Sequence, residues 1–247
     1  MRPAGGRIDT AEAFQEAFGV SRETLDRLAT YEALLKTWQR TINLVSPATL
    51  GEVWHRHFAD SAQLLALGLA PPPSFPPPSR SPPQGGGEIE DAADAQGGKR
   101  WLDLGSGGGF PGLVLAIMLA ERDPEARMTL IESDSRKAAF LAEVARKTGV
   151  AVEIRAERSE NAATQAKSRI NSVITARALA PLPKLLGLVQ PFFSPQTVGL
   201  FPKGREAEVE VEEAKKRFDF DSALAPSLTD AQARIVIVRN LAARTEG

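Results

Sequence analysis

Residues 101–112 read WLDLGSGGGFPG, and this stretch decides which fold the chain can build. A short apolar run leads into the spacing D-x-G-x-G-x-G, which starts at Asp103, and Pro111 then opens a segment with apolar residues at helical spacing. Strand, glycine-rich turn and helix in this order are typical of nucleotide-binding α/β units, because glycine allows tight turns and close approach of a ligand. A dinucleotide fingerprint counted from Gly105 would need glycine where the chain has Phe110. The spacing therefore favours S-adenosylmethionine, whose site holds no pyrophosphate.

Strand-like and helix-like segments alternate from Arg100 almost to the C-terminus. The predicted strands cover residues 100–104, 127–132, 151–155, 172–176, 197–201 and 234–238. The predicted helices cover residues 111–121, 135–148, 160–167, 181–190 and 204–217. This alternation predicts an α/β fold, with parallel strands and crossover helices on both faces of one sheet. A weaker strand candidate at 218–220 precedes the last strand without a clear helix between them, which predicts an antiparallel hairpin at one edge.

The chain before this region is predicted to be a helical extension. One helix ends at Gly19, a second is capped by Ser21, and a third starts at Ser46-Pro47. Residues 71–98 then hold 8 of the 18 prolines and 5 of the 20 glycines, a composition that cannot build a core. We therefore expect a helical extension over 1–70, a disordered linker or loop over 71–98, and a cofactor-binding domain over 99–247.

The composition excludes several kinds of chemistry. Because the chain has no cysteine, it can form no disulfide, no thiolate zinc site and no thiol nucleophile. His55 and His57 are its two histidines, and residues two apart point to different faces of a helix, so no metal site is expected. The N-terminus lacks an apolar core and no stretch reaches transmembrane length, so we expect a cytoplasmic protein without membrane contact. The net charge of −1 neither indicates nor excludes binding to nucleic acid.

Polar residues follow three of the predicted strands, at the sheet edge where α/β proteins bind ligands. Glu132 ends the second strand, where a carboxylate can accept hydrogen bonds from ribose hydroxyls. The turn at 155–160 contains Ser159, which can line an adenine or cap the next helix. Arg177 follows the fourth strand, where it can contact the cofactor or the substrate base, or bridge two loops as a structural residue.

The end of the predicted fourth strand also limits which substrate atom can accept a methyl group. It lacks the Asn/Asp-Pro-Pro-aromatic turn of enzymes that methylate exocyclic amines, and the chain lacks the cysteine that pyrimidine C5 methylation needs. Lys203 is a weak candidate for deprotonating a ribose hydroxyl. Guanine N7 needs no base, because its lone pair is free and in the ring plane, so positioning supplies most of the catalysis. A methyltransferase with a small-molecule or protein acceptor, and a non-catalytic RNA-binding module, remain alternatives; Phe110 disfavours a nicotinamide dehydrogenase.

The third predicted helix carries a further polar group. His57, Asp60 and Ser61 stand at i, i+3 and i+4, and therefore on one helix face. The spacing indicates either a carboxylate that orients an imidazole or a capping and packing cluster.

Together, several stretches resemble one family. They are Arg56-His57-x-x-Asp60-Ser61, DLGSGGGFPG from 103, LIESDSRKAAFL from 130, ARALAP from 176 and Pro202-Lys203-Gly204. They are similar to the bacterial 16S rRNA (guanine(527)-N7)-methyltransferases, also called glucose-inhibited division protein B, over about residues 20–240 without the linker. The resemblance implies a class I, Rossmann-like methyltransferase with a seven-stranded, mostly parallel sheet and an N-terminal helical extension. It implies S-adenosylmethionine as cofactor and 16S rRNA or the small ribosomal subunit as partner; we expect a monomer.

The resemblance also assigns residues to the site. It implies cofactor contacts at Gly105, Phe110, Glu132, Ser159, Glu160 and Arg177, and the spacing of the glycine turn adds Asp103 and Gly107. On the substrate side it implies Arg56, His57, Arg158 and Lys203. We therefore predict Arg177, Lys203, His57 and Arg158 as the catalytic residues.

Overall fold

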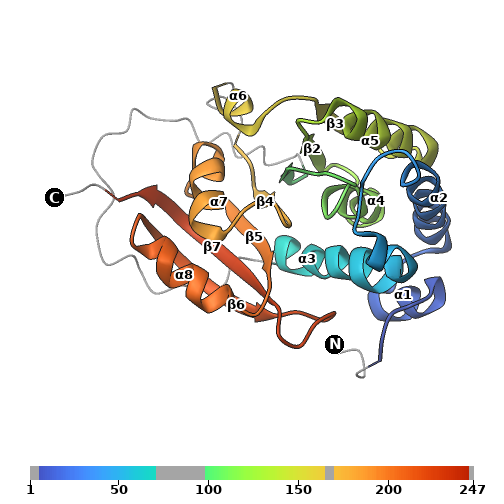
Figure 1. The fold of residues 1–247 in the computed structure, drawn as a ribbon, viewed down its shortest axis with the longest axis horizontal. Helices are drawn as coiled ribbons and strands as arrows, with labels where there is room; N and C mark the ends of the chain where they lie inside the picture. Colours follow the sequence, from blue (N-terminus) through green and yellow to red (C-terminus); the bar gives the residue numbers. More distant parts are fainter. Residues whose placement is uncertain (1–5, 71–97, 165–169, 245–247) are drawn as a thin grey trace.

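The computed structural model describes residues 6–70, 98–164 and 170–244, and a seven-stranded sheet runs through its centre (Figure 1). The predicted linker lies outside the described residues except for Gly98. The strands are β1 (Arg100–Leu104), β2 (Arg127–Ile131), β3 (Val152–Arg155), β4 (Val173–Thr175), β5 (Val198–Lys203), β6 (Phe218–Pro226) and β7 (Arg234–Ala243). Their order in the sheet is β3-β2-β1-β4-β5-β7-β6. The predicted α/β fold is therefore confirmed.

The strand order creates the crevice in which this kind of sheet binds ligands. β1 pairs in parallel with β2 on one side and β4 on the other, so the order reverses between β1 and β4. Ligands of open α/β sheets bind at such a switch point, outside the carboxyl ends of the strands. At the far edge, β7 is antiparallel to both β5 and β6. The predicted hairpin is thus confirmed, and the weak candidate at 218–220 starts a nine-residue strand.

Helices cover both faces of the sheet. They are α1 (Ala11–Phe18), α2 (Arg22–Trp38), α3 (Asp60–Leu69), α4 (Gly112–Arg122), α5 (Ser135–Thr148), α6 (Ser159–Thr164), α7 (Leu182–Val189) and α8 (Ala207–Lys215). The expected caps are present: Ser21 Oγ accepts a hydrogen bond from Thr24 N, and Gly19 ends α1 in the left-handed conformation. Among the described residues, no helix combines the length and the apolar character needed to cross a bilayer.

The third predicted helix is not one regular helix. The chain forms a 3₁₀-helical turn over Pro47–Glu52 and a π-helical segment over Trp54–Ala59 before α3 begins at Asp60. The prediction of one continuous α-helix from Ser46-Pro47 is therefore wrong. The 3₁₀-helical and π-helical segments are six residues long each, which is too short for apolar spacing to separate their periods from that of an α-helix. The π-helical segment carries both histidines toward the carboxyl edge of the sheet.

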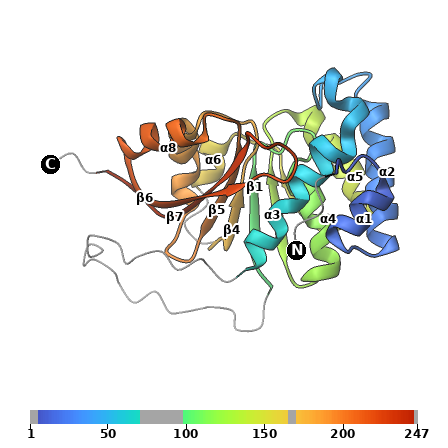
Figure 2. The ribbon, with the colours of Figure 1, turned by 90° about the horizontal axis from the view of Figure 1, so that it is seen from below.

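Two buried clusters lie on opposite faces of the sheet. Figure 2 shows the helices that cover these faces, with α8 on one side and α4 and α5 on the other. Because side chains alternate along a strand, β1 sends Trp101 into one cluster and Leu102 and Leu104 into the other. The first cluster joins α4 and α5 to Phe14, Leu28, Tyr31, Phe58 and Leu64 of the helical extension. The second lies under α7 and α8. The extension therefore forms an outer layer on one face and shares its apolar core with the sheet.

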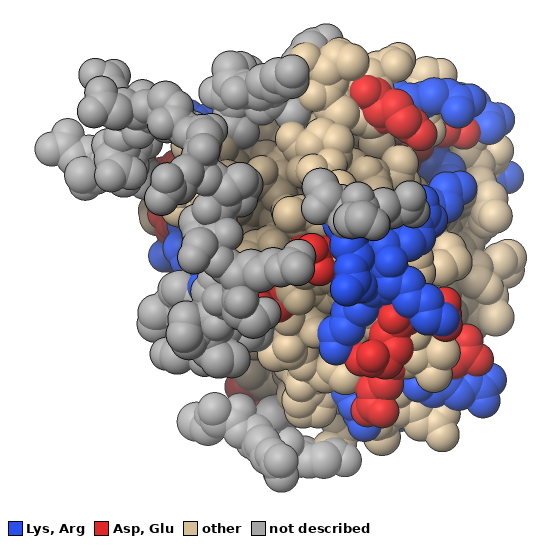
Figure 3. All heavy atoms as spheres, turned by 90° about the vertical axis from the view of Figure 1, so that its left-hand side faces the viewer, with Lys and Arg blue, Asp and Glu red and all other residues tan. Residues whose placement is uncertain are grey.

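The outer surface carries charges of both signs. On the side of the molecule where α8 and the end of β7 lie, Lys and Arg side chains form a group bordered by Asp and Glu (Figure 3). Along α8, Lys215 pairs with Glu212 at 2.8 Å and Lys216 with Glu213 at 2.6 Å. Exposed pairs of this kind contribute little to stability, so they mainly keep the helix solvated.

The chain returns, after residue 97, to the place where it left the extension. Lys99 Nζ donates hydrogen bonds to the carbonyl oxygens of Gly68, at 2.7 Å, and Leu69, at 3.2 Å. These carbonyls end α3 and have no partner within the helix, so the ammonium group caps them. The cap fixes the end of α3 beside the start of β1.

We expect that a linker of about eight Gly and Ser residues can replace residues 71–97, because it can span about 25 Å. The free energy of unfolding should stay within about 1 kcal/mol of the wild-type value, since loop closure depends only weakly on length. Chemical denaturation measures this. Lys99→Met, which removes the cap, is the control and should be less stable. Loss of the cooperative transition in the linker variant would contradict the prediction.

Candidate active site

The glycine-rich turn follows β1 at the switch point and lies close to several other elements. Gly105, Gly107 and Gly109 have φ values of +67°, +55° and +91°. Gly105 N and Ser106 N both donate to Ile131 O at the end of β2, at 2.9 and 3.1 Å. At Gly107, among the described residues other than its chain neighbours, only Gly105 O lies within 4 Å of where a Cβ would be, so the turn is open there. A ligand can therefore approach the backbone at this position.

Asp103 lies inside the protein beneath this turn. Its Oδ1 accepts a hydrogen bond from Thr175 Oγ1 at 2.8 Å, and its Oδ2 accepts one from Gly112 N at 3.3 Å. Burial raises the pKa of Asp103 to about 6, against the opposing effect of these hydrogen bonds. The carboxylate thus joins β1, β4 and α4, and the structure gives it the role of holding the turn.

Glu132 holds the same turn from the neighbouring strand. Its Oε2 accepts a hydrogen bond from Gly107 N at 2.7 Å, and its Oε1 accepts one from Asp134 N at 2.8 Å. The side chain is only 7% exposed. A carboxylate has about four acceptor positions, so Glu132 retains capacity for a further donor such as a ribose hydroxyl.

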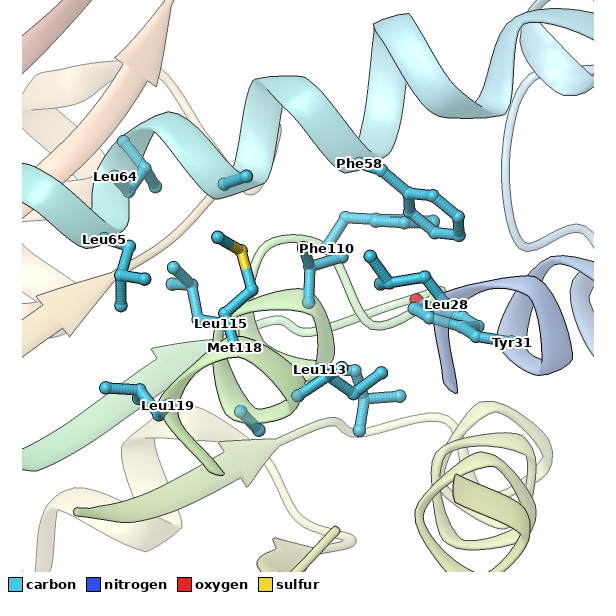
Figure 4. Close-up of a cluster of buried hydrophobic side chains, with 14 of the residues drawn as sticks. Leu28, Tyr31, Phe58, Leu64, Leu65, Phe110, Leu113, Leu115, Met118 and Leu119 are labelled. Carbon is cyan, nitrogen blue, oxygen red and sulfur yellow. The ribbon is translucent and has the colours of Figure 1, made fainter. Parts of the chain in front are cut away.

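Phe110 connects the glycine turn to the helical extension (Figure 4). Its ring stacks on Tyr31 at 5.4 Å and on His57 at 4.8 Å, and the Arg177 guanidinium carbon lies 5.0 Å from the ring centroid. Tyr31 also donates a hydrogen bond from its hydroxyl to Gly108 O. Tyr31 is not among the site residues that the sequence predicted. Its partner is far away in the chain, so no local pattern revealed this contact.

Arg177 is bound by the extension on three sides. Its Nη1 donates to Asp60 Oδ2 at 3.2 Å and to Arg56 O at 3.1 Å, and its Nη2 donates to His57 Nδ1 at 2.9 Å. Arg177 is therefore a structural bridge, but it joins the loop after β4 to the π-helical segment and α3 and not to a second loop. The hypothesis that Asp60 orients His57 is wrong, because Asp60 binds Arg177, Gln63 and Thr229 instead. Both carboxylate oxygens of Asp60 are used in these contacts.

The partners of His57 fix its protonation. Because a guanidinium can only donate, Nδ1 must be the unprotonated nitrogen and Nε2 must carry the hydrogen. Nε2 then donates to Thr49 Oγ1 at 2.9 Å, and the Thr49 hydroxyl donates to Ser46 O at 2.9 Å. Burial, with a smaller effect from Arg177, lowers the pKa of His57 to about 3. His57 is thus neutral, and protein groups occupy both of its nitrogens.

Lys203 is also bound within the protein. Its Nζ donates to Ala180 O at 2.7 Å and to Glu210 Oε2 at 2.8 Å, and its side chain is 10% exposed. The same Glu210 oxygen accepts a hydrogen bond from Leu182 N. Lys203 therefore anchors the loop after β4 to α8, where sequence reasoning expected a group facing the substrate.

Arg158, Ser159 and Glu160 lie one strand away from Glu132, whose N–H donates to Arg155 O at 3.1 Å. Ser159 is the first residue of α6, and Arg158 O accepts a hydrogen bond from Ala162 N at 3.1 Å. Arg158 and Glu160 are exposed, so they lie on the rim of the site and outside the cluster around Arg177. The structure thus brings together the glycine turn, Glu132, His57 and Arg177.

Comparison with known proteins gives this arrangement a family. Residues 89–239 match the model of the family described as rRNA small subunit methyltransferase G. The chain belongs to that family. A relative of this name from Parvibaculum lavamentivorans is 44% identical over 96% of this chain and 92% of its own length. Another from Rhodospirillum centenum is 46% identical over 95% of this chain and 92% of its own length.

Solved structures share the fold of this methyltransferase family at much lower identity. An O-methyltransferase from Bacillus cereus, solved in complex with SAH, superposes with a TM-score of 0.53 and 14% identity. The superposition covers 86% of this chain and 91% of that chain. It supports the Rossmann-like methyltransferase fold and confirms that expectation.

Removing the hydroxyl of Tyr31 should destabilise the glycine turn. We expect Tyr31→Phe to lose about 1–3 kcal/mol of unfolding free energy, because the Gly108 carbonyl loses its buried donor. S-adenosylhomocysteine should bind about tenfold more weakly by calorimetry, the loss equivalent to about 1.4 kcal/mol.

Thr24→Val is the matched control for this variant. It removes another buried hydroxyl of α2, whose partner is Glu121 on α4 and not the glycine turn. We expect it to lower stability and to leave cofactor affinity unchanged. Equal affinities for Tyr31→Phe and wild type would show that the hydroxyl does not position the turn.

The free energy of unfolding should fall less steeply with decreasing pH in His57→Gln than in the wild type. The folded-state pKa is lowered from 6.5 to about 3, so the stability from neutral His57 is present above pH 6.5 and is lost as the pH falls toward 3. The raised pKa of Asp103 makes its contribution to stability change with pH in the opposite direction below about pH 6. This contribution is the same in the wild type and in the variant, so it does not affect their difference. Denaturation midpoints between pH 7.5 and 4.5 test this, and parallel slopes would contradict the lowered pKa.

Proposed function

We propose that this protein transfers the methyl group of S-adenosylmethionine to N7 of a guanine in 16S rRNA. Membership in the rRNA small subunit methyltransferase G family supports the enzyme class, the cofactor and an rRNA substrate. The choice of N7 rests on one observation at the end of β4. Among the described residues, the two predicted catalytic side chains that could deprotonate a substrate there are engaged, since His57 Nδ1 accepts from Arg177 and Lys203 pairs with Glu210.

This arrangement suits an acceptor atom that carries no proton. The N7 lone pair forms the new bond to carbon, the electrons of the sulfur–carbon bond stay on sulfur, and the positive charge moves to the base. The reaction needs alignment and no general base, and alignment by itself can supply several kcal/mol. A ribose hydroxyl or an exocyclic amine would require a proton acceptor in addition.

The glycine turn fits the cofactor on its own geometry. Gly107 leaves the backbone open, and the nearby Glu132 carboxylate keeps free acceptor positions. S-adenosylmethionine supplies an activated methyl group on a sulfonium when it is bound. We assign Gly105, Gly107, Phe110, Glu132, Ser159 and Glu160 to its binding. Asp103 acts from beneath by fixing the turn, and Arg177 by fixing Phe110.

The rim of the site offers cations for the RNA backbone. Arg56 and Arg158 are both exposed, and Arg56 reaches Asp230 only at 4.0 Å. Exposed arginines bind phosphates through charge-assisted hydrogen bonds without reading sequence. The proposal includes a monomeric protein that acts in the cytoplasm, the compartment of bacterial ribosomes.

Incubation of the full chain with labelled S-adenosylmethionine and unmodified 16S rRNA or small subunits tests the proposal. We expect label in RNA, and mass spectrometry of the digested RNA should identify 7-methylguanosine at one position. Label on another nucleoside would overturn the choice of N7. Label on protein or small molecules alone would overturn the RNA substrate, and binding of RNA without transfer would indicate a non-catalytic module.

A further inference from the structure

The loop after β4 is held at both ends by the two cations that sequence reasoning placed in catalysis. At its start, Arg177 binds Asp60, His57 and the Arg56 carbonyl. At its end, Lys203 binds the Ala180 carbonyl. These contacts fix the two residues between the anchors, Ala178 and Leu179, relative to the sheet.

The first of these two residues has an unusual backbone conformation. Ala178 has a φ of +54°, a left-handed backbone conformation that residues other than glycine seldom adopt. Such strain persists only where the surroundings impose it, and it is concentrated at binding and catalytic sites. Here the anchors impose it, and the strained backbone directs the next side chain, Leu179, onto the glycine turn.

Leu179 covers Gly105 while it remains partly open to solvent. A Cβ on Gly105 would lie 2.6 Å from Leu179 Cδ1, so the two residues are in direct contact. Leu179 is nevertheless 36% exposed. Single exposed leucines are ordinary on protein surfaces. Leu179 differs because it is held by two anchors, next to a strained residue, at the switch point of the sheet.

We propose that Leu179 is a substrate-contacting residue whose apolar side chain packs against the ring face of the target base beside the cofactor turn. The inference rests on the proposed function. A base taken from RNA exposes a flat apolar face, which proteins commonly bind with apolar or aromatic side chains. In this place the side chain also keeps water from the reacting atoms. Arg177 and Lys203 then act as positioning residues that hold Leu179 in place.

The test compares Leu179→Ala with Leu224→Ala in the full chain. Leu224 lies on β6 and is also 36% exposed, so it matches Leu179 in exposure but not in location. We expect Leu179→Ala to lower kcat/KM for small-subunit rRNA about tenfold, in the range of a lost base contact. S-adenosylhomocysteine affinity should stay within about twofold by calorimetry, which is below 0.5 kcal/mol. Leu224→Ala should match the wild type, and Leu179→Met should recover most of the activity.

Each other result has a definite meaning. Unchanged kcat/KM in Leu179→Ala, with an active wild type, would overturn the inference and leave the proposed function intact. A parallel loss of S-adenosylhomocysteine binding would also overturn it, because Leu179 would then support the turn and not the base. A wild type that transfers no methyl to RNA would overturn the proposed function and the inference together.

Discussion

The backbone of residues 105–109 is the constraint on which the arrangement of the site depends. Its left-handed positions leave peptide groups pointing outward, and polar atoms from other elements bind them: Ile131 O, the Glu132 carboxylate and the Tyr31 hydroxyl. A Cβ on Gly109 would collide with Tyr31 and Leu113, so the extension can approach only because this position is bare. One glycine turn thus shapes the candidate cofactor site and docks the helical extension.

Local sequence pattern predicted what local geometry determines. The strands, the glycine turn and the caps at Gly19 and Ser21 follow from neighbouring residues, and the structure has them where they were expected. The three-part helix over 47–69 was not predictable in this way, because its 3₁₀-helical and π-helical parts are six residues long each and too short to show a period different from that of an α-helix. Tyr31 was missed as part of the site because its partner, Gly108, belongs to a different element.

The sequence pattern also identified charged residues of the site, but it did not identify the residues with which they pair. Arg177 and Lys203 stand at the expected strand ends, but pairing with Asp60 and Glu210 depends on how helices pack over the sheet. The same holds for His57, whose spacing to Asp60 suggested a pair that the structure replaces with Arg177. The sequence indicates the type of a residue and its position at the end of a strand, whereas the tertiary fold determines which partner its side chain binds.

The cap that Lys99 places on α3 bears on where members of this family can differ in length. The chain leaves and re-enters the described fold at adjoining points, and the helical layer is attached to the sheet through its buried side chains. Closing a loop costs entropy that grows only with the logarithm of its length, about 0.6 kcal/mol for each doubling. Insertions at this junction are therefore close to thermodynamically neutral. The junction is a position where new sequence can accumulate while the candidate active site stays as it is.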